Sequence, residues 1–211
     1  MKYVIACLAF FGLALAPAQA QFDYTPGFEP GAPEELSAYA ALEGEWTIQL
    51  FYPAADADAP AGWRWAEWAE ASSTFEPRLD GAVMLERNSG FPISPGSTGA
   101  EGYDRWRYDV WWSWDRFSNV YRASIVDNLW GFVDIYEGSN AFDVSNLETS
   151  TFNRGGPGGR AQKSRLRITE RGDNRFVLEW WTLDMDVRVE GADRDAQPWQ
   201  PSVRMVYLRA E

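Results

Sequence analysis

Acidic side chains are the residues of this sequence with the clearest capacity for chemistry. The chain has no histidine, and its one cysteine, Cys7, lies near the N-terminus. Ser-His-Asp and Cys-His sites, and zinc sites built from histidine and cysteine, therefore cannot form. Two carboxylates facing one cleft would still permit glycan hydrolysis. Three acids in ring-rich segments are candidates for such a pair: Asp109, Asp134 and Glu179.

The same three acids also fit outward-facing strand residues that pair with neighbouring arginines. We assign no catalytic residue, no metal ligand and no cofactor, and we treat enzymatic activity as uncertain and less favoured than a non-enzymatic role. Acidic loop pairs such as Asp56 and Asp58 lack the spacing of a known calcium loop.

Aromatic residues are the second group with a chemical implication, because the chain has 12 Trp, 9 Tyr and 12 Phe. Large rings either fill a core or line a chamber for an apolar guest. In residues 106–114, every second side chain is aromatic or apolar, which places a continuous ring surface on one face of a strand. The rings expected to line a chamber are Trp65, Trp106, Tyr108, Trp112, Trp114, Tyr121, Trp130, Phe132 and Trp180.

The elements that would position these rings are mostly strands. Pro33, two glutamates and an apolar face predict one short helix at about residues 34–42, and Gly44 ends it. Alternating runs separated by turn-forming residues then predict strands. Their expected ranges are 46–52, 63–75, 81–88, 103–114, 119–127, 130–137, 140–146, 163–170, 175–185 and 201–209. This order predicts an all-β, antiparallel up-and-down barrel of about eight to ten strands.

The N-terminal residues have the layout of a secretory signal peptide. One positive charge at Lys2 precedes an apolar run, and Ala18-Gln19-Ala20 supplies the small residues of a cleavage site. We expect residues 1–20 to be a signal peptide cleaved near Ala20, residues 21–33 an extended lead-in, and residues 34–211 a single domain. The mature protein is then expected in the bacterial periplasm or secreted, without a membrane span.

Several short motifs carry a resemblance to a known family. Leu42-Glu43-Gly44-Glu45-Trp46 stands between the helix and the first long strand, Trp114-Asp115 lies mid-chain, and Val206-Tyr207-Leu208-Arg209 ends the last strand. Residues 36–211 resemble exported bacterial lipocalin-like (calycin-type) β-barrel proteins, a domain of unknown function. The resemblance implies that Gly44, Trp46 and Arg209 close one barrel end, with the arginine over the indole ring. Related barrels bind haem through histidine, which this chain lacks.

Two functions from different classes remain open. The first is a binding module that holds a small apolar or aromatic ligand. The alternative is a structural or interaction protein whose barrel is filled by side chains. A carboxylate-based glycan hydrolase is a weaker third hypothesis. A net charge of −12 argues against nucleic acid as a partner, and the oligomeric state is not predicted.

Overall fold

The computed structural model describes residues 31–93, 104–129, 133–148, 162–184 and 199–210. They belong to one compact unit that spans Gly31–Glu211. The expected signal peptide, residues 21–30 of the expected lead-in, and the predicted ring residues Trp130 and Phe132 lie outside the described residues.

One short helix and twelve strands make up the described part of the chain. The helix, η1 (Glu34–Leu42), is a 3₁₀-helix. The strands are β1 (Gly44–Ala55), β2 (Trp63–Arg78), β3 (Val83–Asn88), β4 (Phe91–Pro92), β5 (Arg105–Trp106), β6 (Tyr108–Asp115), β7 (Val120–Asp127), β8 (Val133–Asn140), β9 (Asp143–Glu148), β10 (Gln162–Arg171), β11 (Arg175–Asp184) and β12 (Gln200–Arg209).

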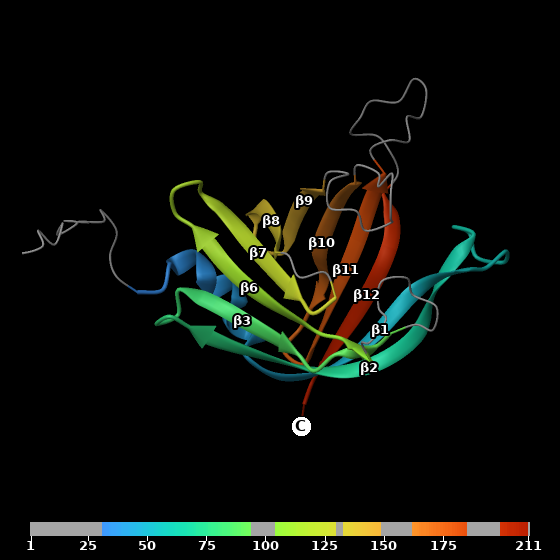
Figure 1. Ribbon diagram of the computed structural model, residues 1–211, viewed down its shortest axis with the longest axis horizontal. Helices are drawn as coiled ribbons and strands as arrows, with labels where there is room; N and C mark the ends of the chain where they lie inside the picture. Colours follow the sequence, from blue (N-terminus) through green and yellow to red (C-terminus); the bar gives the residue numbers. More distant parts are fainter. Residues whose placement is uncertain (1–30, 94–103, 130–132, 149–161, 185–198, 211) are drawn as a thin grey trace, which may run out of the picture. The chain divides into compact units, whose positions relative to one another are not determined.

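Ten of these strands close into an antiparallel barrel in which nearly every strand pairs with its neighbours in sequence (Figure 1). The barrel closes where β1 pairs with β12, in a register that places Trp46 opposite Arg209 and Gln49 opposite Val206. Strands β4 and β5 form a separate two-stranded sheet. The predicted up-and-down barrel with a short N-terminal helix is confirmed.

Two local features differ from the sequence prediction. The turn expected between the predicted strands 130–137 and 140–146 is displaced, because β8 continues to Asn140 and the chain reverses at Ala141 and Phe142. The Asn140 side-chain oxygen accepts a hydrogen bond from the backbone N–H of Phe142, and this contact forms the turn. Strand β4 was missed because two residues are too short to show alternation.

The alternation on β6 places its two faces as the sequence indicates. Tyr108, Val110 and Trp112 are buried inside the barrel, whereas Trp111 is exposed. Ala123 and Ile125 on β7 are buried opposite them, because Ala123 pairs with Trp112 and Ile125 with Val110. The interior is therefore lined by alternate residues of neighbouring strands, as a closed barrel requires.

Helix η1 closes one end of the barrel, which we call the η1 end. Its apolar side chains Leu36, Tyr39 and Leu42 are buried, and η1 packs against β3 and β6. Beside it, Arg209 lies over the Trp46 ring at 4.3 Å and donates hydrogen bonds to three backbone carbonyls. Gly44 has φ of +122°, and a Cβ there would lie 2.9 Å from the Arg209 guanidinium, so this position favours glycine.

The opposite end of the barrel, which we call the far end, is where β1 ends and β12 begins. Strands β3, β7 and β11 also end there, because the antiparallel order reverses direction at every step.

Among the described residues, no helix has the length and apolar character needed to cross a membrane.

Candidate functional site

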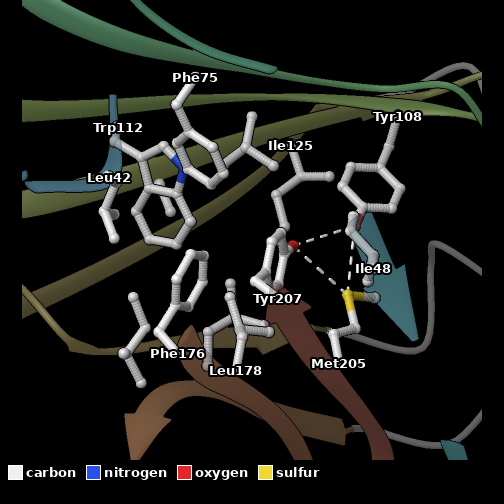
Figure 2. Packing of buried hydrophobic residues seen from close by; sticks show 14 of the residues in the cluster. Leu42, Ile48, Phe75, Tyr108, Trp112, Ile125, Phe176, Leu178, Met205 and Tyr207 are labelled. Carbon is white, nitrogen blue, oxygen red and sulfur yellow. Dashed lines mark hydrogen bonds between the residues drawn. The ribbon is translucent and has the colours of Figure 1, made fainter. Parts of the chain in front are cut away.

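The interior of the barrel is packed most densely near the η1 end. Phe176 and Tyr207 stack with ring centroids 4.1 Å apart, and Trp46 meets Phe176 edge-on at 4.8 Å. Phe75 contacts both stacked rings at 5.9 Å. Figure 2 shows Phe75, Phe176 and Tyr207 close together between the strands, with Trp112 beside them. This half of the barrel is a core of side chains.

A cavity lies on the far-end side of this core, and Trp112 and Tyr207 of the core form part of its wall. About 310 Å³ of space lies between the atoms here, a volume that includes open solvent at the mouth. The enclosed part has room for about one water molecule. A larger guest therefore has to enter from the mouth and displace side chains such as Met205, whose thioether chain is flexible.

Four of the nine predicted ring residues line this cavity: Trp106, Tyr108, Trp112 and Trp180. The other described ones lie elsewhere. Trp114 and Tyr121 pack on each other at 4.6 Å, and Tyr121 meets Tyr39 of η1, so both belong to the η1 end. Trp65 contacts Trp63 at 5.1 Å and is not among the lining residues.

Sequence reasoning did not select the remaining lining residues. They are Glu86, Val110, Ile125, Leu166, Leu178, Met205 and Tyr207. The aliphatic members alternate along predicted strands, so their inward direction could have been inferred, but period-two alternation does not give depth along the barrel axis.

The small sheet of β4 and β5 positions Trp106 at the cavity. Phe91 is opposite Trp106 in the register, with ring centroids 6.3 Å apart, and it is 1% exposed. The Arg105 guanidinium donates to the Gly90 carbonyl, which ties the two short strands together. The Trp106 ring also lies 5.1 Å from the Tyr108 ring. The indole is thereby in contact with two other rings.

Glu86 is the polar centre of the barrel interior, and its side chain is buried. Three donors serve its carboxyl group: Ser73 Oγ at 3.1 Å and the Tyr207 hydroxyl at 2.7 Å donate to Oε1, and Trp112 Nε1 donates to Oε2 at 3.3 Å. The Tyr108 hydroxyl lies 3.5 Å from that of Tyr207 and 3.2 Å from Met205 Sδ (Figure 2). A chain of polar groups thus lies along the cavity wall and includes the buried carboxyl group.

Burial determines the protonation chemistry of this cluster. Removal from water raises the pKa of Glu86 to about 7, and the three hydrogen bonds from Tyr207, Ser73 and Trp112 offset part of that rise. Burial also raises the pKa of Tyr108 and of Tyr207, and the nearby Glu86 charge raises both further. Both phenols therefore remain protonated donors at neutral pH.

The three acids proposed as a glycosidase pair do not face one cleft. Asp109 and Glu179 alternate with inward residues and lie on the outer face, where they contact Arg87 and Arg204. Asp134 is buried and lies opposite the inward residue Ile125, so it faces the interior. Within the described part of the chain, no group of three or more acidic side chains is placed to hold a metal ion.

No family model matches the chain, and no curated protein matches it significantly. Among solved structures, the chain is similar to the structure of EF1p2_mFAP2b bound to DFHBI. The sequence identity is 14%, the match covers 83% of this chain and 99% of that chain, and the TM-score is 0.31. The assignment of a ten-stranded barrel rests on the strand pairing of the chain itself.

Proposed function

We propose that the barrel binds a small, mainly apolar molecule with one or two rings, which enters at the far end. The observation that carries this proposal is the contrast between the two halves of the interior. Stacked rings fill the η1 end, whereas Trp106, Tyr108 and Trp180 surround free space that continues to solvent. Ring-lined concave sites with few polar groups are typical of small-molecule sites.

A substitution that fills the cavity tests this proposal. Ile125 lines the cavity, and Val126, its neighbour on β7, is 40% exposed on the outer face. Ile125→Phe is expected to weaken binding of 1-ethylnaphthalene by at least about tenfold, because the added ring occupies the space of the guest. Equilibrium dialysis with chromatographic measurement of free probe gives the dissociation constants.

Val126→Phe is the matched control, since it adds a similar ring on the opposite face of the same strand. It is expected to leave binding within about twofold of the unmodified protein. Circular dichroism of both variants shows that the barrel is retained. If the unmodified protein binds no apolar ring compound, or if both variants bind as it does, the proposal is wrong.

A second candidate is an interaction protein whose barrel has no ligand. The outer face of β6–β8 favours it, because Trp111, Val133 and Ile135 are exposed there along with Val126. The register joins them in two rows, Trp111–Ser124–Ile135 and Asp109–Val126–Val133. Exposed apolar patches of this kind are typical of interaction surfaces. An absence of any ring-compound binding by the unmodified protein would favour this candidate.

A further inference from the structure

Three hydrogen-bond donors in the far-end half of the barrel lack an acceptor within the described residues. They are the Asn88 side-chain amide, the Trp106 Nε1–H, whose ring lines the cavity, and the Ser164 hydroxyl, on a side chain 1% exposed. Buried polar groups in proteins are nearly always hydrogen-bonded, and one without a partner is destabilising by about 1–3 kcal/mol. Such groups therefore indicate a missing acceptor.

Ser164 is not a lining residue of the cavity, but it lies one inward position from Leu166, which is. It alternates with Leu166 on β10, and both side chains are buried on the inner face. Leu166 lines the cavity opposite Trp180, and Ser164 lies opposite Thr182. Because β10 begins at the far end, Ser164 is one inward position nearer the mouth than Leu166. A ligand that enters from the mouth and contacts Leu166 would therefore pass the Ser164 hydroxyl.

The Tyr108 hydroxyl is a further donor, and the two acceptors that it reaches are weak. Its acceptors are the Met205 thioether at 3.2 Å and the Tyr207 oxygen at 3.5 Å. Thioether sulfur is a weak acceptor, so a carbonyl oxygen would be a better partner for this proton. The Glu86 carboxyl group beside it already receives three hydrogen bonds.

When Glu86 is ionised, above its pKa of about 7, its charge restricts the acceptor that a ligand brings. An anionic ligand would be desolvated beside a buried carboxyl group, and repulsion between like charges is strong where water is excluded. A neutral acceptor avoids this cost. The relevant chemical class is a ketone, quinone, lactone or ether oxygen on a ring compound.

We propose that the ligand of the cavity is a neutral ring compound with a carbonyl or ether oxygen, which accepts hydrogen bonds from Trp106 and Ser164. This inference rests on the proposed binding function. It specifies the polarity of the ligand and names residues that set specificity.

Three probes share a naphthalene ring and differ only in their substituent: 1-acetonaphthone, 1-ethylnaphthalene and 1-naphthoate. Comparing them separates the effect of the ligand's polar group from the effect of ring packing. Trp106→Phe keeps an apolar ring but removes the N–H. It is expected to raise the dissociation constant of the ketone about three- to tenfold and that of the hydrocarbon less than about twofold. Naphthoate is expected to bind at least about tenfold more weakly than the ketone at neutral pH. Equilibrium dialysis measures all three.

Ser164→Ala provides a readout that a purely structural role would not give. It is expected to weaken binding of the ketone selectively while leaving the thermal midpoint of the unliganded protein unchanged or higher, because a buried hydroxyl without a partner is removed. Trp65→Phe is the matched control for Trp106→Phe, since Trp65 does not line the cavity. It is expected to change no dissociation constant.

The outcomes distinguish the two proposals. If both naphthyl probes bind but Trp106→Phe and Ser164→Ala weaken them equally or not at all, the inference about polarity is wrong and the binding function stands. Tight binding of naphthoate would also overturn the inference. If no probe binds the unmodified protein, the binding function is wrong and the inference is wrong with it.

Discussion

Glu86→Gln is expected to abolish a loss of stability that the unmodified protein shows between about pH 5 and pH 8. The pKa of Glu86 is about 7 in the folded protein, raised by burial from its ordinary value of 4.5. Between these two values the folded state binds more protons than the unfolded state, so the free energy of unfolding falls as pH rises. The stabilisation is full below about pH 4.5 and is lost by about pH 7 to 8, a change of about 3 kcal/mol.

Glutamine fits the site because its neighbours are adaptable. Hydroxyl groups both donate and accept hydrogen bonds, so the Ser73 and Tyr207 oxygens can accept hydrogen bonds from the side-chain amide of the glutamine. The amide oxygen can then accept the hydrogen bond from Trp112 Nε1. The variant is therefore expected to match the unmodified protein at about pH 5 and to exceed its stability by about 3 kcal/mol at about pH 8. Urea unfolding followed by tryptophan fluorescence at several pH values measures both.

The absence of histidine makes this pH range unusually simple to interpret, because the side chain that ordinarily titrates there is missing from the chain. Glu137→Gln is the control, since it removes a carboxylate that pairs with Arg122 on the outer face. It is expected to leave the slope of stability against pH in place. Parallel curves for the unmodified protein and Glu86→Gln would show that Glu86 keeps one protonation state throughout.

Most of the fold could be predicted from the sequence because its signals are local. Alternation in residues 106–114 fixed the inner face of β6, and turn-forming residues marked most strand ends within a few positions. The Gly138 turn was misplaced because the β8–β9 hairpin depends on a register shift between Glu137 and Asn140. Pairing between strands, and not local preference, determines such a shift.

The candidate site was only partly predictable. Alternation identified ring residues on the inner face, yet it could not separate Trp106 at the cavity from Trp114 at the η1 end, because they differ only in depth along the barrel. Glu86 was missed altogether. Glu86 lies two residues after Met84 on a short strand, so the alternation of side chains points both inward. A glutamate between Leu85 and Arg87 is nevertheless usually exposed to solvent. Its burial follows from Tyr207, which lies 121 positions away in the sequence.

Arg209→Lys is expected to destabilise the barrel by about 2 kcal/mol, although it preserves the charge. The Arg209 guanidinium donates to the carbonyls of Ala41, Glu43 and Asp173 at 2.8–2.9 Å. These carbonyls come from η1, the residue between η1 and β1, and the β10–β11 turn. A lysine ammonium is a single point donor and cannot reach all three from one position, so backbone acceptors at the barrel closure lose partners.

Arg175→Lys is the matched control for this closure. Arg175 forms an ion pair with Glu170 on the surface, and such pairs contribute about 0–1 kcal/mol. Guanidinium chloride unfolding compares the two variants. Arg209→Lys could lower the free energy of unfolding no more than Arg175→Lys does. The closure is then stabilised by the contact of a positive charge with the Trp46 ring, which lysine retains in part. If the larger loss is found, the barrel closes because one planar side chain bonds three backbone segments, and the ring beneath it mainly orients that side chain.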